Sequence, residues 1–448
     1  MILSAKESAL FLIEKAQRRR ADGEAYIVEY KTREATIENN EIQNTIQASG
    51  VGVAFRVSYN GKMGLAYASG LDRDNLYQLF EDAFLSTKYA VKNDFNAFAE
   101  PPKTVPIVDI YDSSLDEGTI RSTIEHMLSI NRIFPSCNPI RGFDLLHYTE
   151  KGKKVFLANT KGLYVSYPTS DISFWGILRG KNKENEQSYS IFHKCKFFPN
   201  EAEVTNIAKD YAHKLSSLLM TTKEIKNGEY TTIFSPQVTN KFLYSLLLSL
   251  RADIVIKRGT FLSGRLNEKV ASNIVDVVDD GTKNKFYGTL PVDDEGIPAK
   301  SKTLIKNGVL KGFLHTISTA RQTKTEPTGN AKRYNLNKFP SVGATNFFIA
   351  TKDTGVNDLI ASTVKGVYLC DSMGHGFDIA TGNFSLPARG VLVERGEIIH
   401  SVNVFINTKI ESILKNIEGI SDVLGYPSWT DVISPTIKVR GLFLSHIR

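Results

Sequence analysis

The 448-residue chain has few of the residues on which several protein classes depend. Its three cysteines, Cys137, Cys195 and Cys370, are odd in number and far apart, so they do not describe a disulfide framework and favour a reducing compartment. Its longest strongly apolar window, 242–250, is far shorter than the roughly 20 residues that cross a bilayer. Charged residues interrupt the N-terminal apolar stretch before it could serve as a secretion signal. The sequence predicts a cytoplasmic protein without membrane spans.

The spacing patterns of common catalytic sites are missing too. The eight histidines are all at least twenty positions apart, which excludes His-x-x-x-His and His-Glu-x-x-His helices. There is no nucleophile elbow, P-loop or dinucleotide fingerprint. His193 and Cys195 would lie on one side of a strand, and we expect an ordinary solvent-facing pair. His213 falls off the apolar face of its helix and is predicted to be solvated.

Composition and charge indicate a folded protein with more than one core. Apolar residues make up 42% and charged residues 23%, as in globular proteins. A single core stops growing near roughly 250–300 residues, so two or three domains are expected. The net charge of +7 comes from basic residues scattered among acidic ones. A mildly basic solvated surface is therefore favoured over a nucleic-acid face.

Residues 1–95 are predicted to form a first small α+β domain. Ser4 and Glu7 have the spacing of a capping box at the start of a helix. Antiparallel strands follow, with a hairpin turn at Asn60-Gly61. A helix over 72–90, with Asp72 as its N-cap, closes the unit.

Two further domains are predicted after it. A proline-containing linker at 93–114 leads into an α+β domain over 96–223, with helices near 115–133 and 200–220 on either side of strands. Residues 224–448 are predicted to form a larger β-rich domain with a few helices. One of these helices starts after the N-cap Ser235, and another, over 408–419, starts with a Thr408/Glu411 capping box.

Several polar stretches are candidate sites. The acidic pairs and triplets at 279–280 and 293–295 are expected to be solvated loop carboxylates. The stretches TGNAKRYN (328–335) and DSMGHGFDIATGNFS (371–385) combine glycines with polar side chains. Such segments can receive a ligand or another chain, and they can equally be tight corners of a β structure.

Five sequence words, which occur in a fixed order, resemble the TldD/PmbA family, historically called modulators of DNA gyrase. They are GTFLSGRLNEKV (259–270), DDEGIPAKSKTLIKNGVLKGFLH (293–315), TGNAKR (328–333), TGNFS (381–385) and VLVERGEI (391–398). The N-terminal strands are also similar to the family's first domain. In TldD-type members, a helix before the first word carries His-Glu-x-x-x-His, which supplies two zinc ligands and a base. Here Tyr244, Ser245 and Ser249 replace those residues, and they are a poor zinc set.

The resemblance implies a PmbA (TldE)-like subunit of a cytoplasmic metalloprotease for small or unfolded peptides. Such a chain would hold no cofactor itself, and zinc would belong to a catalytic TldD-type partner. The partner could also be a second copy of this chain. The resemblance leaves Asn330, His375, Asp378 and Asn383 as candidate peptide-groove residues. Two alternatives stay open: an independent hydrolase using His375 with a nearby carboxylate (Asp371 or Asp378), and a binding protein acting on DNA gyrase or nucleic acid.

Overall fold

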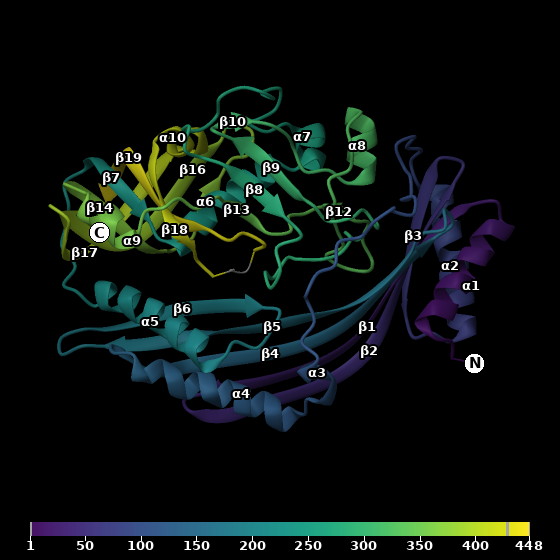
Figure 1. Ribbon diagram of the computed structural model, residues 1–448, viewed down its shortest axis with the longest axis horizontal. Helices are drawn as coiled ribbons and strands as arrows, with labels where there is room; N and C mark the ends of the chain where they lie inside the picture. The colour runs from purple at the N-terminus through teal and green to yellow at the C-terminus, as the bar shows by residue number, and fades with distance from the viewer. Residues whose placement is uncertain (1, 427–429, 448) are drawn as a thin grey trace.

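The computed structural model describes residues 2–426 and 430–447 and confirms a mixed α+β fold with a larger β-rich C-terminal part (Figure 1). The N-terminal half contains α1 (Ala5–Arg18), β1 (Asp22–Glu38), β2 (Glu41–Tyr59), β3 (Lys62–Ser69), α2 (Arg73–Ser86), η1 (Thr87–Tyr89), α3 (Ser114–Glu117), α4 (Ile120–Ile133), η2 (Phe134–Ser136), β4 (Ile140–Asn159), β5 (Tyr164–Lys181), β6 (Glu186–Cys195) and α5 (Glu201–Leu218). None of the helices in the described ranges is both long and apolar enough to cross a membrane.

The six N-terminal strands form one antiparallel sheet in the order β3-β2-β1-β4-β5-β6. The central strand β1 joins the two halves, because Tyr30 lies opposite Gly50 of β2 on one side and Lys153 of β4 on the other. Strands on both sides of the predicted division at residue 95 therefore share a single sheet.

Alternation along β1 separates the two faces of this sheet. Ala25 and Ile27 lie beneath α1 and α2, whereas Ala35 and Ile37 lie beneath α4. Side chains of the opposite face, such as Tyr26, pack towards the C-terminal half. Figure 1 shows the long strands curving around that half, with α1, α2 and α4 on the outer side. The sheet thus has an outer helical face and an inner face that meets the second domain.

Local capping in the first unit agrees with the sequence prediction. The Ser4 hydroxyl accepts from the N–H of Glu7, and the Glu7 carboxylate accepts from the N–H of Ser4 at 2.8 Å. Asp72 caps α2 by accepting from the N–H of Asn75 at 2.9 Å. Asn60 and Gly61 both have positive φ, as a type I′ hairpin requires.

The C-terminal half contains two main sheets around the largest core. The larger has seven strands in the order β14-β7-β19-β17-β16-β15, with β18 paired to β19, and the smaller has the order β10-β9-β8-β13. The buried face of helix α6 packs into the same hydrophobic core as side chains from both sheets. The elements are β7 (Gly228–Phe234), α6 (Pro236–Ser249), α7 (Ala252–Arg258), β8 (Val277–Asp280), β9 (Ser301–Lys306), β10 (Val309–Leu310), α8 (Ile317–Thr323), β11 (Ala331–Lys332), β12 (Ser341–Val342), β13 (Phe347–Ile349), α9 (Val356–Ala361), β14 (Lys365–Ser372), β15 (Gly376–Phe377), β16 (Asn383–Glu394), β17 (Glu397–Lys409), α10 (Ile410–Lys415), β18 (Ile417–Leu424) and β19 (Pro435–His446).

Two predicted helix starts differ from the structure. The capping box at Thr408 is wrong, because Thr408 pairs with Phe384 in the sheet and the Glu411 carboxylate binds Arg265 at 3.0 and 3.1 Å. Helix α10 consequently covers only Ile410–Lys415. Helix α6 does begin after Ser235, but the Ser235 hydroxyl donates to the carbonyl of Cys370 at 3.2 Å instead of capping the helix. Distant partners displaced the local caps in both places.

His193 lies in the core, which contradicts the prediction of a solvent-facing position. It is opposite Phe174 in the sheet, stacks on that ring at 5.1 Å and meets the edge of Tyr426 at 5.0 Å. Only 6% of it is exposed, and burial lowers its pKa to about 4. Its neighbour Cys195 also loses most of its solvent contact, and burial raises its thiol pKa. His213 is exposed, as predicted.

The buried His193 makes stability sensitive to acid. Its folded pKa of about 4 lies below the ordinary value of 6.5, so the unfolded chain takes up a proton first as pH falls. The wild type should lose stability between about pH 6.5 and pH 4, by roughly 3 kcal/mol from this group. We expect His193→Gln to show a shallower loss in urea unfolding across that range. The matched surface variant His213→Gln should keep the wild-type slope, and an equal change in both variants would contradict the assignment.

Candidate functional site

A cluster of buried charges joins the inner face of the N-terminal sheet to the C-terminal domain. We call Glu24, Arg56, Glu295 and Arg333 the interface cluster. Arg56 donates to the two oxygens of Glu24 at 2.9 and 2.8 Å and to Glu295 at 3.0 Å. Arg333 donates to Glu24 at 2.6 Å. All four side chains are at most 5% exposed. The words DDEG and TGNAKR therefore meet each other at the N-terminal sheet.

The expectation of solvated loop carboxylates is wrong for Asp279, Asp293 and Glu295, which are all buried. Asp293 accepts hydrogen bonds from the backbone N–H groups of Glu295, Ile297 and Ala331. Gly296 lets this turn approach the sheet, because its φ is +88° and a Cβ there would lie 2.3 Å from Leu163. These carboxylates organise the turn from inside.

Asn330, one of the predicted groove residues, belongs to the same buried region. Its side-chain nitrogen donates to Asp279 at 2.8 Å and to the carbonyl of Gly343 at 2.9 Å. Asp279 also accepts from Thr345 and pairs with Lys302 at 2.9 Å. Asn330 thereby ties the TGNAKR segment to β8.

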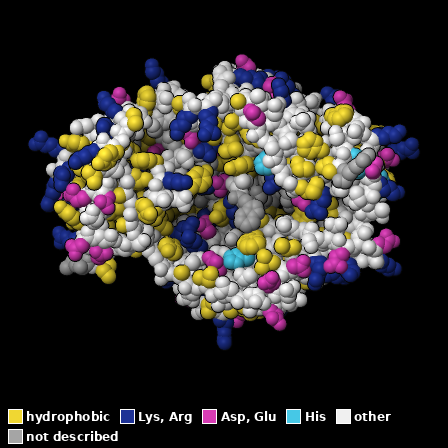
Figure 2. All heavy atoms as spheres, turned by 180° about the vertical axis from the view of Figure 1, so that it is seen from behind, with side chains coloured by type: hydrophobic (Ala, Val, Ile, Leu, Met, Phe, Trp, Pro, Cys, Tyr) yellow, Lys and Arg dark blue, Asp and Glu magenta, His cyan; other side chains and the backbone are white. Residues whose placement is uncertain are grey.

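A cavity of about 220 Å³ lies next to the interface cluster, between the two domains. The side of the molecule drawn in Figure 2 is hollowed near its centre, where Lys and Arg side chains meet Asp and Glu. Both domains contribute charged and polar side chains to the wall of the cavity, among them Lys153, Asp171, Lys196, Asp294, Asn330, Lys332, Arg333 and Asp431. We take this interdomain cavity as the candidate site.

Burial perturbs the titratable groups around the interdomain cavity. Burial lowers the pKa of Lys194 to about 8, although Asp431 opposes this change. It also lowers the pKa of Lys196. Burial by itself would raise the pKa of Asp171, but Lys196 and Lys153 hold it well below its usual range. Ionisable groups with shifted pKa values in one cavity are typical of functional sites.

Sequence reasoning found only part of this wall. It identified the segment with Asn330 and Lys332, but it missed Lys196, Asp171 and Asp431 in the wall and Lys194, which pairs with Asp431. The available pattern was the alternation of the two lysines with His193 and Cys195 at the end of β6 and just beyond it, because it places both lysines on the face opposite the imidazole.

The positions expected to replace the zinc motif lie on α6 and do not fit a metal. Ser245 and Ser249 are buried, and their hydroxyls donate to the helix carbonyls of Lys241 and Ser245 at 3.2 and 3.1 Å. Tyr244 packs partly buried against the core. Hydroxyl groups already bonded to the backbone are weak zinc ligands. No group of three His, Cys, Asp or Glu side chains within 2–426 and 430–447 is placed to hold a metal ion.

The other three predicted groove residues lie together beside β15. His375 is largely exposed. Its pKa is lowered mainly because part of the ring is buried, and to a smaller extent by the positive charge of Lys241. Asp378 accepts from the N–H groups of Ala380 and Thr381, which lowers its pKa, and its own N–H donates to the carbonyl of Asn383 at 2.9 Å. Asp378 and Asn383 therefore build a tight corner of the hairpin.

The hydrolase alternative needs a carboxylate that orients His375. Asp371 is bound instead to Arg389 at 2.6 Å, and Asp378 is bonded to the amides of its own turn. The arrangement does not resemble a His–carboxylate pair.

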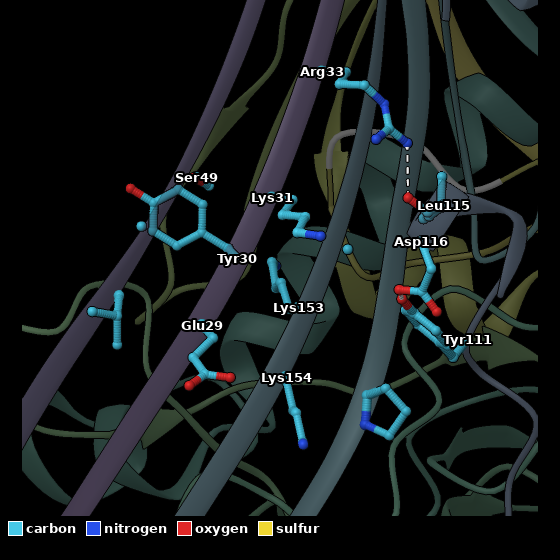
Figure 3. A pocket seen from close by; sticks show the side chains of 14 residues that line it. Glu29, Tyr30, Lys31, Arg33, Ser49, Tyr111, Leu115, Asp116, Lys153 and Lys154 are labelled. Carbon is cyan, nitrogen blue, oxygen red and sulfur yellow. Dashed lines mark hydrogen bonds between the residues drawn. The ribbon is translucent and has the colours of Figure 1, made fainter. Parts of the chain in front are cut away.

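A larger groove of about 760 Å³ lies elsewhere, on the outer face of the N-terminal sheet (Figure 3). Glu29, Lys31 and Lys154 line it, and Arg33, whose guanidinium donates to the carbonyl of Leu115 at 3.1 Å, closes one end. The groove lies on the part of the outer face between two pairs of helices. Helices α1 and α2 cover the sheet on one side of it, and α3 and α4 lie on the other side (Figure 1). It contains none of the five sequence words.

The loss of one member of the interface cluster should strongly destabilise the fold. Replacing one member of a buried ion pair leaves an uncompensated charge, so Arg56→Met should lower the free energy of unfolding by about 3–5 kcal/mol. The matched variant Arg19→Met breaks the exposed pair with Glu81 and should cost only about 0–1 kcal/mol. Urea unfolding of the two variants measures the difference, and similar losses would contradict a special role of Arg56.

Comparison with known proteins places the chain among metallopeptidase homologues. Residues 227–446 match the PmbA/TldA metallopeptidase C-terminal domain, and residues 23–86 match PmbA/TldA metallopeptidase domain 1. A metalloprotease of Methanocaldococcus jannaschii is 25% identical over 81% of each chain. A metalloprotease PmbA homolog of Haemophilus influenzae is 23% identical over 95% of this chain and 94% of its own length.

Solved structures share the fold over almost the whole length. TldE from Thermococcus kodakarensis superposes with a TM-score of 0.88 at 21% identity, covering 98% of this chain and 100% of its own. A Thermotoga maritima protein named as a modulator of a DNA gyrase also has a TM-score of 0.88, at 22% identity over 99% of this chain and 100% of its own. With both domain matches and this shared fold, the chain belongs to the PmbA/TldD family.

Proposed function

We propose that this chain is a zinc-motif-lacking subunit of a cytoplasmic PmbA/TldD-type metalloprotease. In this proposal it forms part of a cleavage chamber and helps to hold small or unfolded peptides. A TldD-type partner, or a second copy of the chain, completes the chamber. Zinc and the catalytic base belong to a TldD-type partner.

The observation that carries this proposal is that α6 has no side chains able to bind zinc at the positions of the family's zinc motif. Both serines at the positions of the family's zinc motif are buried and bonded to the helix backbone. A side chain that could deprotonate a metal-bound water is missing from these three positions. The helix therefore supports the domain core here.

Peptide holding is supported by the position of β15. This strand is the last in the order of the seven-stranded sheet and pairs with β16. An extended peptide can add to such an edge through main-chain hydrogen bonds, which tolerate many side chains. His375, Asp378 and Asn383 flank that edge.

The proposal predicts the behaviour of the purified chain. By itself it should carry well under one zinc per chain in elemental analysis and leave an unfolded peptide uncleaved. Mixed with a TldD-type subunit from the same cells, it should increase chelator-sensitive cleavage at least tenfold over either chain alone. Stoichiometric zinc together with chelator-sensitive cleavage by the isolated chain would overturn the proposal.

A matched variant tests whether α6 takes part in chemistry. Ser245→Ala removes a hydroxyl that is already bonded to the carbonyl of Lys241, so cleavage by the mixed subunits should stay within twofold of wild type. A loss of more than tenfold, with unchanged subunit association, would show that the serine acts on substrate.

A further inference from the structure

Arg333 has buried hydrogen-bond donors that find no acceptor among the described residues. Its side chain is 2% exposed and lines the interdomain cavity. One terminal nitrogen, Nη2, donates to Glu24, while Nε and Nη1 have no hydrogen-bond partner among the residues that the structure describes. A buried donor without an acceptor costs roughly 1–3 kcal/mol. An acceptor from outside the chain would remove that cost.

Asn330 offers an unused acceptor in the wall of the same cavity. Both partners of its side-chain nitrogen, Asp279 and the carbonyl of Gly343, are acceptors, so the orientation of the amide is fixed. Its Oδ1 atom is buried and has no partner within 2–426 and 430–447. This oxygen can receive one N–H or O–H.

The surrounding ammonium groups outnumber their carboxylates. Lys153 and Lys196 share Asp171, and Lys194 and Lys332 share Asp431. Lys194 also lies 4.0 Å from the ring centroid of Tyr287. Burial lowers the pKa of Lys194 and of Lys196, which is the response of cations that lack full compensation. An additional negative charge would stabilise Lys194 and Lys196. Burial by itself would lower the pKa of Lys332, but Asp431 already raises it.

We propose that the interdomain cavity binds a compact oxyanion, either a carboxylate or a phosphate group. Arg333 and Lys332 hold its oxygens, and Asn330 accepts a hydrogen bond from an N–H or O–H next to the anion. The volume of about 220 Å³ is below the ~300 Å³ of ordinary ligand pockets. The occupant is therefore a small molecule or the charged end of a peptide. Anion binding at this site does not depend on whether the chain takes part in proteolysis.

Thermal unfolding of the full chain at low ionic strength tests this site. Inorganic phosphate probes the phosphate source, and alanylalanine probes the carboxylate source. Alanylalanine amide, in which a neutral amide replaces the carboxylate and the amino group is kept, is the control. We expect at least one of the two anions to raise the Tm saturably, and the amide to leave it unchanged. Added sodium chloride should weaken the effect, because it screens the charges.

Variants decide whether binding occurs in the cavity. Lys332→Gln and Arg333→Gln should each weaken the anion at least tenfold. Lys306→Gln removes the same charge from a pair with Asp276 outside the cavity wall and should stay within twofold of wild type. Lys332 is partly exposed, so its variant decides the question even if Arg333→Gln does not fold. No saturable shift with either anion, an equal shift with the amide, or an equal loss in Lys306→Gln would each overturn the proposal.

Discussion

The arrangement of the two domains depends on the ion pairs that Arg56 makes across their boundary. Arg56 comes from the N-terminal sheet, binds Glu24 of the neighbouring strand and reaches Glu295 of the C-terminal domain. Because all three groups are removed from water, none of them can lose a partner without leaving an unpaired buried charge. This constraint fixes the DDEG turn against the inner face of the sheet.

The interdomain cavity follows from that attachment. Once Glu295 is held by Arg56, the neighbouring TGNAKR segment is placed over the sheet, with Arg333 on Glu24 and Lys332 on Asp431. The strands β1, β4 and β5, together with Lys196 just after β6, supply the opposite wall. The TGNAKR segment, which looks like a simple turn in the sequence, thus forms one wall of the charged interdomain cavity.

Particular elements show where prediction from sequence worked. The capping box at Ser4 and the hairpin turn at Asn60-Gly61 needed only residues a few positions apart, and both formed as expected. The box at Thr408 failed, because a sheet pairing and an ion pair with Arg265 competed with it. His193, Asp279, Asp293 and Glu295 were assigned to solvent, yet their burial depends on covering segments far away in sequence.

The sequence by itself determined the α+β class, the family words and the missing zinc set, because composition, local periodicity and motif order are properties of the chain. The tertiary structure alone decided that the first strands form one sheet with those of 140–195, and that Asp279, Asp293 and Glu295 are buried. It also decided that Asn330 lies away from the corner holding Asp378 and Asn383. These outcomes depend on desolvation and on partners distant in sequence, which no local pattern encodes.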